Sequence, residues 1–495
     1  MVHWKPMQIK NKAEIESIEA STCLHNNIQF IKEKFNYSAD LVVSELSWNQ
    51  KDIAIIYIES ICESEKIQRE ILIPLSHKNE GSLKEVLIAN KLQTTCFLNE
   101  CIEALLQGKC IVNVNGQTEI IVLDVISSFQ RAISEPENEK VVRGSHEGLI
   151  ERLQVNLHLI RRVIVNPNLS IKYYTIGAET NTKIALVYMN TIANNALIQE
   201  VEKRITNIDV DAIISPNFTE QLIEDFPFSP FPQILNTERI DRIAANLMEG
   251  RVVLLSEGNP TALILPVTFW AFYQSPDDYN SRWIVGTFFR LLRLLSFIIA
   301  ISLPSIYIAI TSFHLEVVPN ELILPMKNAV KNIPYPPIVE AFLMELTIEL
   351  LREAGIRLPT PIGQTIGIVG GLVIGDAVVK AGLISNIMII VVALTAISSF
   401  VVPSYELSTT VRLLRFPIMV MAYLFGFIGI TFGIMIIFIH LCKIHSFGSP
   451  YFAPFAPFRG KDIKDSFVRF PIWLLNQRPK DSLAKKLQQQ RTSRE

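Results

Sequence analysis

The chain of 495 residues is long enough for about three domains, and its formal net charge is only −2. That near-neutral total conceals two unlike halves: residues 1–280 carry 25 Lys and Arg against 36 Asp and Glu, whereas residues 281–495 carry 21 against 12. A wholly soluble protein is excluded by uncharged runs in the second half, because a helix of roughly 20 apolar residues crosses a hydrocarbon core. Four such runs occur: Leu294–Leu315, Leu358–Gly375, Ala381–Tyr405 and Phe416–Cys442.

The sequence lacks the signatures of several classes of protein function. No apolar stretch of the length of a secretory signal occurs near Met1, so we expect residues 1–280 to stay in the cytoplasm. The six cysteines form no C-x-x-C pair, and free thiols are expected. No phosphate loop, dinucleotide fingerprint, H-E-x-x-H or G-x-S-x-G pattern is present. We therefore expect neither an enzyme nor a metal, cofactor or nucleic-acid site.

Residues 1–133 are predicted to form a first cytoplasmic module. Asp52–Glu59 and Glu119–Val125 have the composition of buried strands, and Leu83–Asn90 and Leu98–Leu106 have helical spacing. The polar residues 134–148 then predict a linker.

Residues 149–280 are predicted to form a second module with α/β or α+β layers, because strands and helices alternate. We expect helices at Leu149–Val165 and Asn195–Ile205, strands at Ile171–Ile176, Lys183–Met189 and Val210–Ser215, and a hairpin of Val252–Leu255 with Ala262–Val267. The pair Arg161 and Arg162 fits either the wet face of its helix or an interface, and the sequence does not decide between them.

An aromatic and basic segment precedes the first apolar run. We expect its rings to form a collar at the headgroup level, where Trp and Tyr are enriched. Arg282, Arg290 and Arg293 flank Leu294 and place that side of the run in the cytoplasm. The rings are Phe269, Trp270, Phe272, Tyr273, Tyr279, Trp283, Phe288 and Phe289.

Residues 281–442 are predicted to form a helical transmembrane domain with about four spans, and residues 443–495 a basic cytoplasmic tail. The tail has 11 basic and 4 acidic residues, which places it inside together with residues 1–280. Residues 316–357 then lie outside. Arg412 and Arg415 also fall in an outside loop, against the positive-inside rule, so a re-entrant run or an acidic segment that dips into the bilayer remains open.

The helical pattern Pro337–Arg352 carries Glu340, Glu345 and Glu349 among apolar neighbours. Carboxylates at membrane depth are costly and usually face water, a partner or an ion path. We therefore expect the three glutamates to face water, a partner or an ion path, and an amphipathic helix on the outer surface is the equally weighted alternative.

Glycines recur every four residues within residues 363–382, and such a ridge lets helices approach closely. Ordinary packing within one chain is the favoured explanation from spacing alone. The functional alternative is a set of oligomeric helices around a pore, with an apolar constriction that closes by dewetting. The candidate residues are Gly363, Gly367, Gly371 and Gly375 for the ridge, Val369 and Val373 for the constriction, and Asp376 with Lys380 as an i, i+4 pair.

Five segments lie in order over roughly residues 140–480: VRGSHEG, NLHLIRRVIVNPNL, LREAGIRLPTPIGQTIGIVGGLVIGDAVVKAGLIS, FVVPSYELSTTVRLLRFP and HLCKIHSFGSPYFAPFAP. Together they resemble the A subunits of the GerA-type nutrient germinant receptors of endospore-forming bacteria. Residues 1–133 carry no such motif. Many members of the family have an uncharged residue where Asp376 stands, which argues against a general pore role for Asp376.

The resemblance implies a multi-pass protein of the spore inner membrane. It implies a homo-oligomer that works with a transporter-like, nutrient-binding B subunit and a lipoprotein C subunit, and that opens as a ligand-gated channel for monovalent cations. With such a channel, Glu340, Glu345 and Glu349 are candidates for attracting cations to its mouth. A secondary transporter component and a non-conducting scaffold or signalling subunit are the alternatives. The transporter is disfavoured because no internal symmetry is visible in the four runs.

Overall fold

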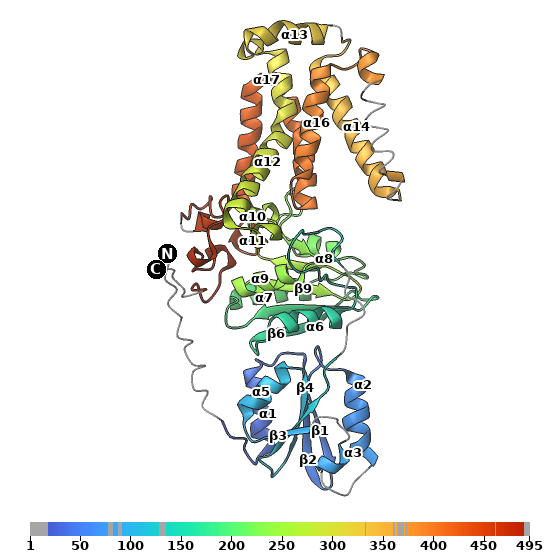
Figure 1. Cartoon of the computed structure of the whole chain (residues 1–495), viewed down its shortest axis with the longest axis vertical. Coiled ribbons are helices and arrows are strands. Elements are labelled where there is room, and N and C mark those ends of the chain that lie inside the picture. The colour runs from blue at the N-terminus through green and yellow to red at the C-terminus, as the bar shows by residue number, and fades with distance from the viewer. Residues whose placement is uncertain are drawn as a thin grey trace.

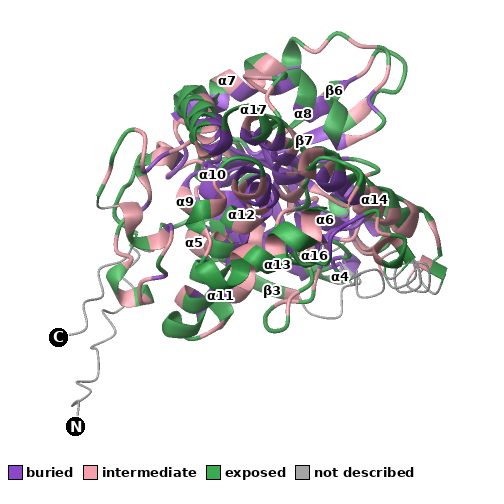
Figure 2. Cartoon of the chain, turned by 90° about the horizontal axis from the view of Figure 1, so that it is seen from above, coloured by how far each residue is buried: buried purple, intermediate pink, exposed green. Residues whose placement is uncertain are grey.

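The computed structural model of the chain describes residues 18–77, 83–87, 92–127, 135–331, 333–359, 362–363, 371, 375, 377–460 and 462–489. Two soluble modules, the membrane helices and a tail follow one another along its long axis (Figure 1). Seen along that axis, buried residues occupy the centre of the molecule (Figure 2).

Module 1 is a five-stranded sheet with helices on both faces. Its strands lie in the order β1-β2-β4-β5-β3, and every pair is antiparallel. Alternation along β2 explains the two faces: Ala54 and Ile56 pack under α1 and α5, whereas Ile53 and Ile55 pack under α2 to α4. The elements are α1 (Leu24–Lys34), β1 (Leu41–Trp48), β2 (Lys51–Ile58), α2 (Ser64–Ile67), a π-helical turn (Gln68–Leu72), α3 (Ile73–His77), α4 (Leu83–Val86), β3 (Leu92–Thr95), α5 (Leu98–Leu106), β4 (Lys109–Val114) and β5 (Ile120–Asp124).

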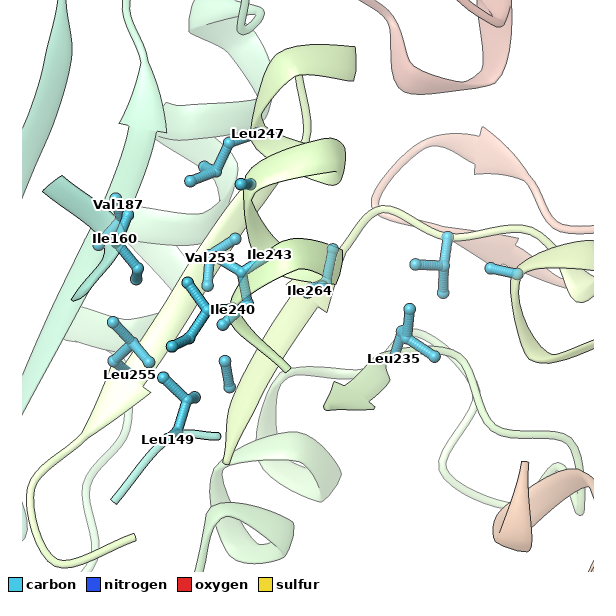
Figure 3. Close-up of a cluster of buried hydrophobic side chains, with 14 of the residues drawn as sticks. Leu149, Ile160, Val187, Leu235, Ile240, Ile243, Leu247, Val253, Leu255 and Ile264 are labelled. Atoms are coloured by element: carbon cyan, nitrogen blue, oxygen red, sulfur yellow. The ribbon is translucent and has the colours of Figure 1, made fainter. Parts of the chain in front are cut away.

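Module 2 repeats this topology. Its sheet has the order β6-β7-β9-β10-β8, which is the same order counted from the first strand of the module, and its pairs are again antiparallel. Buried side chains of α6 and α9 cover one face of this sheet, as Figure 3 shows. The elements are α6 (Leu153–Val163), β6 (Leu169–Ile176), β7 (Thr182–Met189), α7 (Asn195–Thr206), α8 (Pro216–Ile223), β8 (Leu235–Thr237), α9 (Ile240–Glu249), β9 (Val252–Ser256) and β10 (Ala262–Leu265).

The mixed α/β character predicted for the soluble region is confirmed, with one element wrong. The segment Val210–Ser215 forms no strand. Its backbone is bonded by the turn between β6 and β7 instead: the amide of Ala178 donates to Val210 O, and the Thr182 hydroxyl donates to Ile213 O. Bonds to a turn and to a threonine side chain satisfy the segment without a sheet partner.

A buried ion pair joins the two modules. Arg161 of α6 donates from Nε and Nη2 to both carboxylate oxygens of Asp40, each at 2.9 Å, and both side chains are at most 1% exposed. Ser38 and Ser60 donate to the same carboxylate. The interface reading of Arg161 is therefore correct, whereas Arg162 is exposed and pairs with Glu147.

The junction to the membrane helices is built from short helices, α10 (Phe269–Tyr273) and α11 (Pro276–Asn280). Phe269, Trp270, Phe272 and Tyr273 are at most 5% exposed. The prediction that these four rings lie in a collar at the headgroup level is therefore wrong. Tail aromatics cover them: the ring centroids of Trp270 and Phe467, for example, are 4.6 Å apart.

The membrane helices run between two ends, a near end beside module 2 and a far end opposite. Helix α12 (Trp283–Ser312) extends from the near end to the far end, where α13 (Asn320–Lys331) lies across it (Figure 1). Helix α14 (Pro337–Arg357) returns: the Ser385 amide donates to Glu340 at the far end, and Arg352 Nη2 lies 3.0 Å from Ser399 Oγ at the near end. Residues 316–357 therefore do not all stay beyond one end of the helices.

The remaining described helices are α16 (Asn386–Phe400) and α17 (Tyr405–Lys443). Gly426 in α17 has φ 59° and ψ −139°, a conformation open essentially only to glycine. A Cβ atom at Gly433 would lie 3.5 Å from Ile418 Cγ1, although 15 helical residues span about 22 Å. Helix α17 is consequently a hairpin of two legs, and both of its ends lie at the near end.

The structure does not confirm four spans. Among the described residues, α12 and α17 are long and apolar enough to cross a membrane, and α16 is a shorter apolar helix. The run Phe416–Cys442 is wrong as a single crossing because it contains the turn at Gly426. The run Leu358–Gly375 lies largely outside the described residues. Arg412 and Arg415 lie within the first leg of α17 and not in a loop, so their predicted place in an outside loop is wrong.

The tail folds back onto module 2. The amide of Lys485 donates to Ile192 O at 2.8 Å, and the Arg478 guanidinium donates to Met248 O at 2.6 Å. The tail contains β11 (His445–Ser446), β12 (Ser449–Pro450) and 3₁₀ turns at Asp462–Asp465, Ile472–Leu474 and Lys480–Ser482. A hairpin, short turns and backbone bonds thus attach the tail to both the soluble region and the base of α12.

Candidate functional site

Two glutamates of α14, Glu345 and Glu349, face the first leg of α17. Glu345 and Arg415 form an ion pair in which both side chains are 1% exposed. One turn further along α14, Glu349 pairs with Arg412, and Arg352 lies 3.6 Å from the same carboxylate. These residues form a charge network, defined as Glu345, Glu349, Arg352, Arg412 and Arg415.

The charge network is not saturated with hydrogen bonds. Glu345 Oε1 and Glu349 Oε1, like Arg352 Nε and Arg415 Nε, are buried without a hydrogen-bond partner among the described residues. Three guanidinium groups face two carboxylates, which leaves a formal charge of +1. Removing either partner of such a buried pair is costly, because the other charge is left without compensation.

Glu340 lies apart from the charge network, at the far end of α14. It is 1% exposed and accepts the backbone amide of Ser385, the N-cap of α16. The Ser385 hydroxyl is 3.0 Å from Tyr307 Oη of α12, so these groups connect three helices. Glu340 Oε2 has no hydrogen-bond partner among the described residues, and no ion pair to Glu340 is found there. The N-terminus of α16 carries a partial positive charge that favours a carboxylate at this place.

The glycine ridge is described only in part. A Cβ atom at Gly363 would lie 2.8 Å from the carbonyl oxygen of Gly355 in α14, which is a close helix approach. Gly371 is exposed, and a Cβ atom at Gly371 or Gly375 would meet no atom of the described part of the chain within 4 Å. Lys380 ends a helical turn and is exposed. The other candidates lie outside the described residues: Gly367, Val369, Val373 and Asp376.

A second set of paired charges fixes the base of α12. Arg290 Nε lies 3.0 Å from Asp278 of α11, and Arg293 pairs with the same carboxylate, which is 1% exposed. Arg290 also binds the tail, with Nη1 2.8 Å from Asp465 Oδ1. Two of the three arginines of the predicted basic flank, Arg290 and Arg293, are therefore buried and paired with one aspartate, and Arg290 also links α12 to the tail.

Carboxylates also meet where α8 of module 2 approaches the start of α17. Burial, together with the negative charges of Glu406 and Glu224, raises the pKa of Glu220 to about 8. Burial and the neighbouring Asp225 raise the pKa of Glu224 to about 7. Thr410 of α17 donates to Pro230 O beside them. This contact between a soluble helix and a membrane helix thus responds to protonation near neutral pH.

Sequence reasoning found the three glutamates but missed the α17 arginines that pair with two of them, Glu345 and Glu349. A usable signal was present, because isolated charges in apolar surroundings normally pair with one another. The conflict of Arg412 and Arg415 with the predicted topology was that signal. Among the described residues, no group of three or more His, Cys, Asp and Glu side chains is placed to hold a metal ion.

The fold and the paired charges define a membrane protein with a two-module soluble region and a bundle of helices that contains buried ion pairs. The chain belongs to the Bacillus/Clostridium GerA spore germination protein family, whose model matches residues 29–481. The match includes both soluble modules, so the family extends over residues 29–133, which carry no recognisable motif.

Relatives of known name cover most of the chain. Spore germination protein A1 of Bacillus subtilis (strain 168) is 39% identical over 92% of this chain and 96% of that protein. Spore germination protein KA of the same organism is 37% identical over 93% and 86%. A crystal structure of the N-terminal domain of the A subunit of the Bacillus megaterium spore germinant receptor GerK3 is 30% identical, covers 51% of this chain and 98% of that domain, and gives a TM-score of 0.39.

Proposed function

We propose that the chain is the A-type subunit of a nutrient-responsive spore germination receptor that oligomerises into a ligand-gated channel for monovalent cations. The observation that carries this proposal is the open glycine face. Among the described residues, Gly371 and Gly375 have no neighbour within contact distance of a Cβ atom. Small residues on a membrane helix are favourable where another helix packs closely, so this face suits a second copy of the chain.

The helix of residues 363–382 is then the wall of the pore, with Gly363, Gly367, Gly371 and Gly375 at the contacts between subunits. Val369 and Val373 form the apolar constriction that closes the pore by dewetting. Asp376 and Lys380 form a pair at its end. Most of this segment lies outside the described residues. The support for these roles is therefore the pattern of the sequence.

The three glutamates of α14 take different roles in this proposal. Glu340 suits the attraction of cations best, because it lies at the far end and has no cationic partner among the described residues. Glu345 and Glu349 are offset by Arg415 and Arg412, and they hold α14 against α17 in the conformation described. Any attraction of cations by these two requires that their ion pairs separate.

The proposed location is the spore inner membrane, with both termini in the cytoplasm. The common position of the soluble modules and the tail at the near end supports this topology, as does the basic charge of the tail. The proposed partners are further copies of the chain, a nutrient-binding transporter-like B subunit, a lipoprotein C subunit and membrane lipid.

The test is potassium efflux from liposomes that contain the purified receptor with its partner subunits. We expect nutrient-dependent efflux from the wild type, and nutrient-independent efflux at least several-fold above wild type for V369A and V373A, because a smaller apolar ring dewets less readily. Val420→Ala, on an exposed face of α17, is the matched control and leaves efflux unchanged. Tight liposomes with both pore variants contradict the gate, and no efflux from the wild type under any nutrient contradicts the channel.

A further inference from the structure

Module 2 exposes four large apolar side chains at α8 and in the segments on either side of it. Phe218 and Leu222 stand four residues apart on α8, and both are close to half exposed. Ile214, before the helix, is 75% exposed, and Phe228, after it, is fully exposed. Single exposed apolar residues are ordinary, but a concentration of them on one segment indicates a contact surface. We call these four residues the α8 patch.

The loop of residues 226–232 is fixed in a shape that holds Phe228 outward. The side chain of Gln233, which is 1% exposed, accepts the amide of Phe226 at 2.9 Å and donates to Phe226 O at 2.7 Å. Phe231 is buried in the core of module 2. Three prolines restrict the backbone further. Because both ends of the loop are fixed, the exposure of Phe228 is a property of the folded loop.

The same loop contacts both ends of α17. Ser229 Oγ lies 2.9 Å from Nε2 of His440 in the last turn of the helix, and Thr410, near its start, donates to Pro230 O. The residue before His440 is Ile439, which is 61% exposed on a helix long and apolar enough to cross a membrane. The loop therefore lies at the end of α17, where its exposed apolar surface stops.

Helix α8 lies beside the membrane helices and not beneath them. Figure 1 shows it on the side of module 2 that is nearest to these helices, and the view along the long axis shows it next to α17 (Figure 2). Its exposed face carries Phe218 and Leu222, and its buried face carries Thr219, Glu220 and Ile223. A bilayer that surrounds α17 therefore brings its headgroup region next to the exposed face of α8.

The segments that carry the α8 patch contribute no exposed charge. Within residues 212–223 and 226–232 the only ionisable residue is Glu220, which is buried. The two acidic residues between these segments, Glu224 and Asp225, are both half-buried. Uncharged aromatic and aliphatic side chains are favourable in the interfacial region of a bilayer, and their binding increases with the apolar area that is buried there. Lipid suits this surface without any requirement for anionic headgroups.

We propose that the α8 patch inserts into the headgroup region of the leaflet next to the soluble modules, so that module 2 binds lipid directly. The membrane helices already hold module 2 at the bilayer. Insertion is therefore an intramolecular step, and four side chains are sufficient although their own affinity is low. This proposal rests on the membrane location of α17, and it is independent of oligomerisation and of ion conduction.

Fluorescence quenching of the full chain in lipid nanodiscs tests the proposal. A bimane label is attached to F228C, with V165C on module 2 and L46C on module 1 as matched controls at exposed apolar positions. We expect phosphatidylcholine with a nitroxide headgroup to quench the label at position 228 at least threefold more than the two control labels. We expect aqueous iodide to quench it at least threefold less. The exposed cysteines are first replaced by serine; they are Cys23, Cys96 and Cys442.

Two results overturn the proposal. Equal quenching by the nitroxide lipid at the three positions shows that Phe228 does not reach the bilayer. Protection of position 228 from both quenchers shows that a protein surface, such as a second copy of the chain, covers the patch in place of lipid.

A charge at the tip of the loop separates insertion of the patch from closeness to the bilayer. With the label at L222C, Phe228→Asp lowers quenching by the nitroxide lipid at least twofold, because an ionised carboxylate leaves water only at a high cost. Leu46→Asp introduces the same charge on module 1 and leaves the quenching unchanged. Quenching that is the same with and without F228D overturns the proposal, and so do equal effects of F228D and L46D.

Discussion

Buried ion pairs are found in both halves of the molecule, but their hydrogen bonding differs. In the soluble region the carboxylate of Asp40 accepts bonds from both Arg161 nitrogens, from Ser38 and from Ser60. In the membrane region Glu345 pairs with Arg415, yet its second oxygen has no partner among the described residues. Both oxygens of the Asp40 carboxylate are hydrogen-bonded, whereas one oxygen of the Glu345 carboxylate is not hydrogen-bonded to any described residue.

This difference indicates different roles. A fully bonded buried pair holds one geometry, because any shift breaks several bonds at once. A partly bonded pair has lower cost for rearrangement, since its free oxygen is available to a new donor. We therefore interpret the contact of modules 1 and 2 as rigid, and the contact of α14 with α17 as the place where the membrane helices change their packing.

The largest effect is expected from Asp40→Ala. It leaves Arg161 buried without compensation and lowers the free energy of unfolding by about 3–5 kcal/mol. Urea unfolding of the detergent-solubilised chain measures the loss. The control is Glu147→Ala, which removes the exposed partner of Arg162 and costs less than about 1 kcal/mol. Equal losses from the two variants contradict the rigid joint.

A smaller effect is expected from Glu345→Gln. The amide keeps the shape of the side chain but removes the charge opposite Arg415, at a cost of about 2–3 kcal/mol. The double variant E345Q/R415Q recovers part of this loss because neither charge remains, and a double-mutant cycle measures the coupling. Additive losses in the cycle show that the pair does not hold α14 to α17.

The smallest effect is a pH dependence at the contact of α8 with α17. The pKa of Glu220 is raised from 4.5 to about 8, so its protonated form is favoured in the folded state. The stability from this contact is full below about pH 4.5 and is lost as the pH rises through 8. Glu220→Gln stays neutral and raises Tm at pH 8.5 by roughly 2–4 °C. Glu179→Gln, at an exposed position, is the control, and an unchanged Tm for E220Q contradicts the shift.

Much of the soluble fold follows from the sequence. Buried strands such as Asp52–Glu59 and Lys183–Met189 are marked by apolar composition, and the structure has strands there. The edge strands β3 and β8 cannot be recognised in this way, because their sequences LQTT and LNT are short and largely polar. The shared topology of the two modules is also not recognisable from the sequence, because the modules share a strand order and no sequence motif.

The membrane half was less predictable from the sequence. Apolar runs mark helices but not their ends, so the turn at Gly426 within Phe416–Cys442 leaves no trace in hydropathy. Helix α14 is predicted as a helix outside the membrane, because both ends of the chain are placed inside and four runs are counted as crossings. The arginine partners of Glu345 and Glu349 lie about 60 to 70 residues further along the chain, and only the tertiary fold brings these charges together.

The central claim is that copies of this chain surround a pore lined by residues 363–382. A structure of the oligomer in a lipid membrane tests it most directly. The account predicts a closed ring in which Val369 and Val373 are nearest the axis and Gly371 and Gly375 contact the neighbouring copy. A monomer, or a ring whose axis is lined by α12 or α17, would contradict it.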